Sequence, residues 1–149
     1  MKTLQKLSLL LLSILVFSAC SNSDDNDNQT INCTTVCIYT ATSGQTAASV
    51  PATAHGTFDL TYQFASANSP FANGTTGTFS LSATTLVVNI NGEDCIKLEN
   101  PVARGAENFL FIDNCRDNIT YNVSTNTDGT FAEVNIEPIG TGFFGQFGQ

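Results

Sequence analysis

Hydrophobic and polar residues alternate along most of the chain after residue 54, with the two-residue period that is typical of β-strands. In the clearest run, 57–64, Phe58, Leu60, Tyr62 and Phe64 share one face and polar residues take the other. Similar runs bounded by turn residues predict strands over 57–64, 77–81, 85–90, 95–98, 109–112, 119–123, 130–137 and 142–147. No segment has helical periodicity. We therefore expect an all-β fold, a single antiparallel β-sandwich or a small closed barrel of about eight short strands.

The dipeptide Asn91–Gly92, between two of these runs, is a strong signal for a β-hairpin. A two-residue loop there places Leu86 opposite Lys97, whereas a three-residue loop places Leu86 opposite Leu98. Because the second register buries more apolar surface, we expect Leu86 to face Leu98.

The N-terminus has a different pattern. Two lysines precede Leu7–Phe17, an eleven-residue run that is apolar apart from two serines. That length is too short for a membrane-spanning helix, which needs about 20 residues, and is typical of a secretory signal peptide. The residues Phe17-Ser18-Ala19-Cys20 follow, and they resemble the lipobox of bacterial lipoproteins, in which an apolar residue and two small ones precede a cysteine.

This resemblance implies that Cys20 is lipidated on its sulfur, that the signal peptide is cut before it, and that the freed amine is acylated. Two or more acyl chains make such an anchor stable. Ser21 follows the cysteine, whereas an Asp there favours inner-membrane retention in Gram-negative lipoproteins. The acid-rich run after it resembles tethers that bring some lipoproteins to the cell surface. We expect a lipid-anchored outer-membrane protein that faces the cell exterior.

Four regions follow from these patterns. Residues 1–19 are the predicted signal peptide, and 20–32 are the lipidated cysteine and a polar, acidic tether that we expect to be disordered. Residues 33–53 form a cysteine-containing N-terminal segment and loop, and 54–149 the all-β domain. The body resembles the small β-rich lipoproteins of Gram-negative envelopes.

The four cysteines of the body are Cys33, Cys37, Cys95 and Cys115. An even number in an exported chain predicts two disulfides, with three possible connectivities. Cys95 and Cys115 flank two predicted strands, and antiparallel pairing of those strands would bring the two cysteines together. We therefore favour Cys95–Cys115 together with Cys33–Cys37, which requires a turn between the latter two.

The charge balance narrows the possible partners. Of 13 acidic and 5 basic residues, two lysines lie in the signal peptide, so that the mature chain has three basic residues and a net charge of −10. Such a chain repels phosphate backbones, which excludes nucleic acid as a partner. It also repels anionic lipid, so we expect contact with the membrane only through the covalent lipid.

Residues that carry chemistry are scarce. The one histidine, His55, begins a predicted strand, and no nucleophile motif or cofactor fingerprint is present, so we predict no catalytic residue and no cofactor. Asp113 and Asp117, with neighbouring asparagines, offer oxygen ligands for Ca²⁺. The alternative, which we prefer, is that these residues are in a turn and accept hydrogen bonds from backbone amides, with no metal.

Phenylalanines are the candidate partner contacts. Phe71 lies in a Ser-Pro-Phe-Ala-Asn-Gly loop, where it is either an exposed anchor or folded back onto the core. On a C-terminal strand, Phe143 and Phe147 would share one face and Phe144 would take the other. If that strand lies at a sheet edge, one phenylalanine is exposed where a partner can add. If it is a central closing strand, the phenylalanines belong to the core.

These observations predict a non-catalytic protein, a binding or envelope-structural module at the cell surface. One alternative is a lipocalin-like barrel that holds a small apolar ligand against the face formed by Phe58, Leu60, Tyr62 and Phe64. Another is a hydrolase of extracellular polymers, which would need two carboxylates from different strands converging in one cleft.

Overall fold

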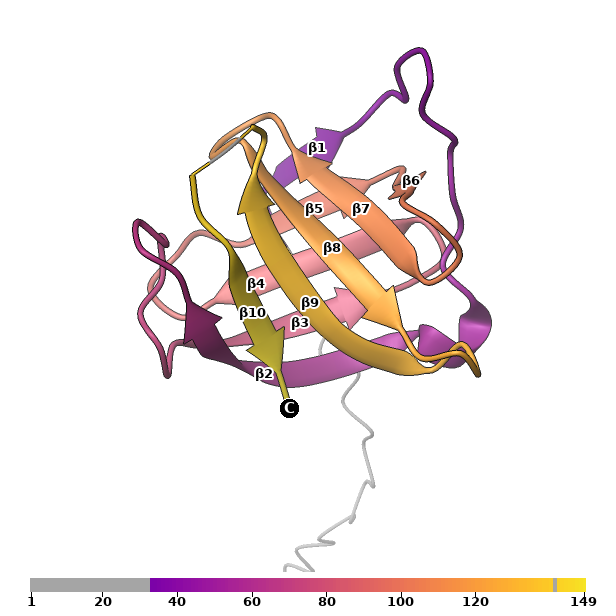
Figure 1. The fold of residues 1–149 in the computed structure, drawn as a ribbon. Coiled ribbons are helices and arrows are strands. Elements are labelled where there is room, and N and C mark those ends of the chain that lie inside the picture. The colour runs from indigo at the N-terminus through magenta and orange to yellow at the C-terminus, as the bar shows by residue number, and fades with distance from the viewer. Residues whose placement is uncertain (1–32, 141) are drawn as a thin grey trace, which may run out of the picture.

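The computed structural model describes residues 33–140 and 142–149, which contain ten strands (Figure 1). The strands are β1 (Thr35–Ile38), β2 (Gly56–Ala65), β3 (Thr76–Leu81), β4 (Thr85–Ile90), β5 (Ile96–Glu99), β6 (Val102–Ala103), β7 (Asn108–Asp113), β8 (Ile119–Thr125), β9 (Phe131–Pro138) and β10 (Gly145–Gly148). A short 3-10 turn, η1 (Ala52–Ala54), precedes β2. No helix in these residues is long and apolar enough to cross a membrane. The signal peptide, Cys20 and the tether lie outside the described residues.

All ten strands belong to one sheet, in the order β1-β5-β4-β3-β2-β10-β9-β8-β7-β6. Neighbouring strands are antiparallel except β1 and β5, which are parallel. The sheet curls into a half-barrel, with β3, β4 and β5 as one wall, β7, β8 and β9 as the other, and β2 curving beneath them (Figure 1). The all-β prediction is confirmed at this level. The sheet is neither a closed eight-stranded barrel nor a sandwich of two separate sheets.

Each strand expected from the hydrophobic pattern overlaps a strand of the sheet. In β4 and β5, Leu86 pairs with Leu98, which confirms the register chosen from apolar burial. The two strands without a predicted counterpart are short. β1 has four residues and β6 has two, too few for alternation to be recognised.

A β-bulge changes the orientation of one predicted core residue. Tyr62 of β2 pairs with Phe147, but the next pair in the ladder is Phe64 with Gln146, so that Gln63 is an extra residue. The extra residue moves Phe64 to the outer face, where its side chain is 51% exposed. The prediction that Phe64 faces the core is therefore wrong, although Leu60 and Tyr62 are buried as expected.

Aromatic side chains fill the interior between the two walls. The ring of Phe147 lies 4.7 Å from that of Tyr62 and 4.9 Å from that of Phe79, measured between centroids. Phe111 and Tyr121 of the other wall are also fully buried. The inner face of β2, which a lipocalin-like barrel would present to a ligand, is thus in contact with other core side chains.

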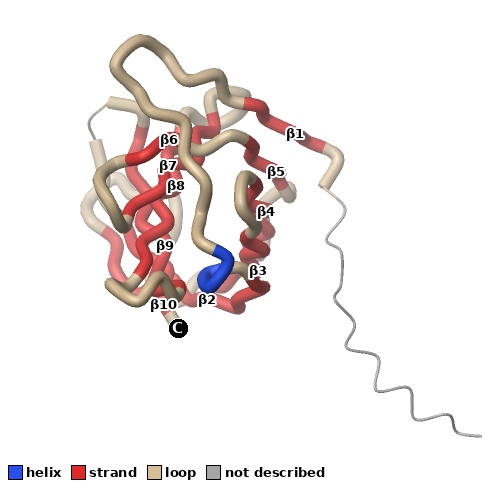
Figure 2. The backbone as a smooth tube through the Cα atoms, turned by 90° about the vertical axis from the view of Figure 1, so that its right-hand side faces the viewer, coloured by secondary structure: helices blue, strands red, loops and turns tan. Residues whose placement is uncertain are grey.

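The segment 39–51 lies along the open side of the half-barrel, between its two walls (Figure 2). Backbone hydrogen bonds attach it to both sides: the Ala48 amide donates to Pro101, the Ala103 amide donates to Thr46, and the Val50 amide donates to Ala83. Val50 is buried in the core. The region expected to be a loop outside the main domain therefore covers the open side of the sheet.

The disulfides differ from the favoured pairing: they join Cys33 to Cys95 and Cys37 to Cys115. The Cα–Cα distances are 5.1 Å and 5.8 Å. Residues 35–38 are extended, so Cys33 and Cys37 lie too far apart to be bridged to each other. The strands expected to bring Cys95 and Cys115 together, β5 and β7, lie on opposite walls instead of pairing. The Cys37–Cys115 disulfide consequently links the edge strand β1 to the turn after β7, across the opening.

Candidate functional site

The predicted phenylalanine contacts do not form a single surface. Phe147 is fully buried, and Phe71 packs on the core with its ring 5.7 Å from Tyr62. Phe143 also packs against the core. Phe144 is 43% exposed and its ring lies 5.9 Å from Phe64. Of the two alternatives for the C-terminal strand, the central position is confirmed and the edge position is wrong, because β10 lies between β2 and β9 in the sheet.

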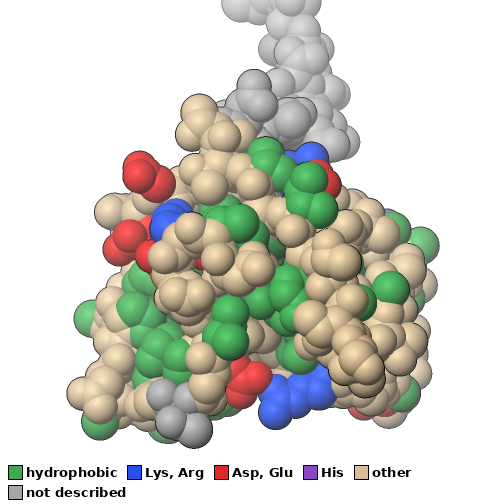
Figure 3. All heavy atoms as spheres, turned by 90° about the horizontal axis from the view of Figure 1, so that it is seen from above, with side chains coloured by type: hydrophobic (Ala, Val, Ile, Leu, Met, Phe, Trp, Pro, Cys, Tyr) green, Lys and Arg blue, Asp and Glu red, His purple; other side chains and the backbone are tan. Residues whose placement is uncertain are grey.

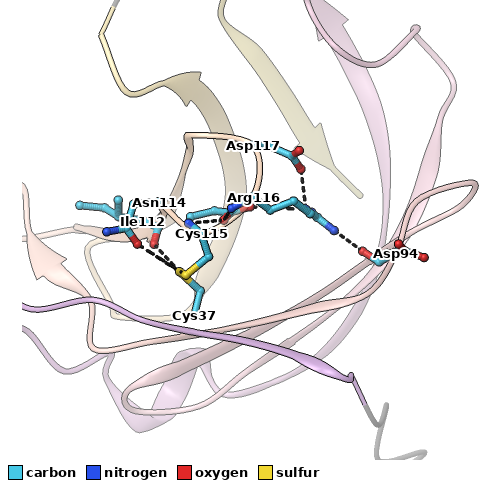
Figure 4. Close-up of polar contacts among 8 residues, drawn as sticks. Cys37, Asp94, Ile112, Asn114, Cys115, Arg116 and Asp117 are labelled. Carbon is cyan, nitrogen blue, oxygen red and sulfur yellow. Dashed lines mark hydrogen bonds and ion pairs between the residues drawn. A yellow bond between two sulfur atoms is a disulfide. The ribbon is translucent and has the colours of Figure 1, made fainter.

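Asp113 and Asp117, the candidate calcium ligands of the less favoured interpretation, flank an arginine. The Arg116 Nε atom lies 2.6 Å from Asp117 Oδ2 and 3.7 Å from Asp113 Oδ2, and its Nη1 donates to the Asp94 carbonyl (Figure 4). Asp113 is fully buried, and its Oδ1 accepts the amides of Cys115 and Arg116, as expected for an aspartate that begins a turn. The positive charge between the two carboxylates is already supplied by Arg116, and a cation would have to displace it.

This cluster continues into the core through Tyr121. Its hydroxyl is buried and has no partner of good hydrogen-bond geometry among the described residues, although the Arg116 guanidinium lies near it. Burial raises the pKa of Tyr121 above its ordinary value, and the nearby Arg116 charge opposes that shift only in part. The cluster joins the β7–β8 turn to the core next to the Cys37–Cys115 disulfide, which indicates a structural role.

Outside this cluster, the candidate groups for acid–base chemistry each have a polar partner of their own. His55 is exposed and its Nε2 lies 3.1 Å from the Val50 carbonyl oxygen. Glu133 accepts hydrogen bonds from Asn135 and Gln146, and Glu137 is paired with Arg104. Residues 33–140 and 142–149 contain no cluster of three or more His, Cys, Asp or Glu side chains that could hold a metal ion.

A groove of about 610 Å³ lies where residues 39–45 meet the outer face of the wall formed by β7, β8 and β9. Its residues come from three parts of the chain: Tyr39, Thr42 and Gln45; Arg104, Leu110, Ile112, Asn114, Asn118 and Thr120; and Glu137, Pro138, Ile139 and Gly140. Figure 3 looks onto this end of the molecule, where hydrophobic side chains gather in a hollow between polar lobes.

The N-terminal wall of the groove is held in place by its own hydrogen bonds. Gln45 Oε1 accepts from the Tyr39 hydroxyl at 3.0 Å and from the Thr42 amide at 2.8 Å. Gly44 provides the positive φ of +86° that the turn between Thr42 and Gln45 needs. The Tyr39 amide extends the β1–β5 pairing by donating to Glu99. The tyrosine ring is thus fixed at the rim of the groove.

Charge and polarity in the groove are mixed. Arg104 and Glu137 form an ion pair in which neither side chain is buried. The remaining lining consists of apolar side chains, hydroxyls and amides. Among the described residues, one carboxylate, Glu137, lines this groove, whereas hydrolysis by paired carboxylates needs two.

A row of polar side chains crosses the outer face beside the groove. Gln146, Asn135 and Asn122 lie in register on β10, β9 and β8. Phe64 of β2 pairs with Gln146 at one end of the row, and Leu110 of β7 pairs with Asn122 at the other. Leu110 also lines the groove, so the row and the groove are continuous.

Sequence reasoning did not identify this site. Tyr39 lies in a segment with no strand pattern, and Arg104 and Glu137 come together only through the pairing of distant strands. One signal was available: Tyr39 is the tyrosine outside the apolar phase of the predicted strands.

Comparison of the chain with protein-family models, with curated proteins and with solved structures finds no match to any of them.

Proposed function

We propose that this chain is a lipid-anchored envelope protein on the cell exterior, and that its β body is a non-catalytic binding module. The anchor and location are supported by the lipobox-like residues ending at Cys20 and by the acidic run after it. Four paired cysteines are in keeping with an oxidising compartment. The twelve residues between Cys20 and Cys33 span at most about 40 Å when extended, which lets the body stand away from the membrane.

The observation that carries the binding function is the groove between residues 39–45 and the outer face of β7, β8 and β9. It combines an apolar floor with hydroxyl, amide and ionic groups at its rim, which is the composition expected of a ligand site. The interior of the half-barrel is filled by Tyr62, Phe79 and Phe147, which does not favour the lipocalin-like alternative. In the part of the chain that the structure describes, Glu137 is the one carboxylate that lines the groove, which does not favour the hydrolase.

Anchoring and location are tested on intact cells. Radiolabelled palmitate is expected to enter the wild-type protein and not Cys20→Ala, and added protease is expected to remove the body from the cell surface. Labelling of the variant would refute the lipid anchor. Protection from protease would place the body inside the outer membrane.

The binding site is tested with the purified lipoprotein in a detergent that has no sugar headgroup. Its melting temperature is measured against neutral oligosaccharides, fatty acids and acidic peptides. A ligand at 100 times its Kd stabilises the folded state by about 2.7 kcal/mol, or about 10 °C for a body of this size. We expect a shift with one class and its loss in Leu110→Arg, which places a charge in the groove. No shift with any class, or a shift that Leu110→Arg leaves unchanged, would refute the groove.

A further inference from the structure

We infer that the groove and the adjoining row form one continuous site for an uncharged oligosaccharide. This inference rests on the proposed binding function and names its ligand class.

The charge distribution argues for an uncharged ligand. Residues 33–149 contain ten acidic and three basic residues, so the body repels polyanions at long range. Within the groove, Arg104 and Glu137 neutralise each other, and the other lining residues carry no charge. A ligand rich in hydroxyl groups meets no net charge in the groove and finds both donors and acceptors there. The Glu133 carboxylate beside the row would repel an anionic ligand.

The row supplies hydrogen-bonding groups at regular spacing. Asn135 donates its amide hydrogens to Ser124 and Glu133, and Gln146 donates to Glu133, which fixes the two side chains with their carbonyl oxygens as acceptors. Five strands contribute one residue each from Phe64 to Leu110, and adjacent strands are about 4.8 Å apart, so the row is about 19 Å long. A row of this length suits an extended chain of several sugar units.

Cross-strand bonds between such side chains also stabilise sheets, and the row alone would not indicate a ligand. The second observation is the aromatic pair at its end. The β2 bulge places Phe64 on the outer face beside Phe144, and the two residues are 51% and 43% exposed. An exposed aromatic ring offers an apolar surface to the C–H face of a sugar. Tyr39 offers another ring at the groove.

The test measures binding of the purified lipoprotein, in the same sugar-free detergent, to an array of neutral and acidic oligosaccharides. The neutral oligosaccharide that binds best is then titrated by calorimetry. We expect neutral oligosaccharides to bind in preference to acidic ones. The double variant Phe64→Ala/Phe144→Ala and the single variant Asn135→Ala are each expected to raise Kd about tenfold, equivalent to about 1.4 kcal/mol.

Two matched controls separate the site from general effects on the sheet. Val36→Ala/Ile38→Ala removes two exposed apolar side chains of β1, and Asn89→Ala removes a half-buried asparagine on the outer face of β4. Both are expected to leave Kd within about twofold of wild type, which is below 0.5 kcal/mol. Circular dichroism and thermal unfolding verify that each variant is folded.

The outcomes distinguish the two proposals. Absence of neutral-oligosaccharide binding, tighter binding of acidic ones, or equal losses in site and control variants would each overturn this inference. If a fatty acid or peptide binds instead and Leu110→Arg abolishes that binding, the groove remains the binding site and only the ligand class is wrong.

Discussion

The ion pair between Arg116 and Asp113 provides a quantitative test of how the β7–β8 turn is held. In Arg116→Met the apolar stem of the side chain is retained and the charge is removed. Asp113 is fully buried, and the variant leaves its Oδ2 without a compensating charge. Breaking a fully buried pair in this way costs about 3–5 kcal/mol.

Two features place the expected loss at the lower end of that range. The Arg116 side chain is 25% exposed, and Asp113 Oδ1 keeps its two backbone amides in the variant. We therefore expect Arg116→Met to lower the free energy of unfolding by about 3 kcal/mol. The matched control is Arg104→Met, whose ion pair with Glu137 is exposed, with 55% of the Arg104 side chain accessible. Its expected cost is about 0–1 kcal/mol.

The assay is urea unfolding of the purified lipoprotein under non-reducing conditions, followed by far-UV circular dichroism and analysed by linear extrapolation. Added salt is expected to reduce the small effect of Arg104→Met and to leave that of Arg116→Met nearly unchanged, because buried charges are screened least. A loss in Arg116→Met no larger than in Arg104→Met would show that the cluster does not stabilise the fold as argued.

Three further predictions concern the core and the covalent links. Non-reducing peptide mapping is expected to find Cys33 linked to Cys95 and Cys37 linked to Cys115. A peptide that links Cys33 to Cys37 would contradict the fold. In Gly145→Ala the added methyl group would overlap the Tyr62 hydroxyl, so we expect the free energy of unfolding in urea to fall by about 3 kcal/mol. A fall below about 1 kcal/mol would contradict this packing. The pKa of Tyr121 is raised in the folded state, so its contribution to the free energy of unfolding is fully present below the unfolded pKa near 10 and is lost as the pH rises above it. Tyr121→Phe is expected to lessen this fall in stability at high pH. Equal slopes of unfolding free energy against pH in the variant and the wild type would refute the prediction.

The parts of the fold that were predictable are those decided by local pattern. Leu60 and Tyr62 alternate with polar residues, so their burial follows from strand geometry alone. The pairing of Leu86 with Leu98 follows from apolar burial within a hairpin. Phe64 breaks the pattern because one extra residue in β2 reverses the orientation of the side chains that follow, and a bulge has no reliable signal in a single sequence.

Pairing between distant segments was not predictable from pattern. The sequence contains the four cysteines, but their connectivity depends on β1 pairing in parallel with β5, a strand about 60 residues later. The groove depends on the same long-range pairings, because Tyr39, Arg104 and Glu137 come from segments that are far apart in sequence. Residue types alone could not show that these side chains share a surface.

The open side of the half-barrel connects stability with the proposed site. A curled sheet that does not close leaves edges that can pair with other chains, and this protein limits them with short edge strands, the Cys37–Cys115 link and the segment 39–51. The residues that cover the opening also hold Tyr39 and Gln45 at the groove. A change that releases this segment, such as the loss of Val50 from the core, is therefore expected to weaken ligand binding together with stability, whereas changes at Phe64 should affect binding alone.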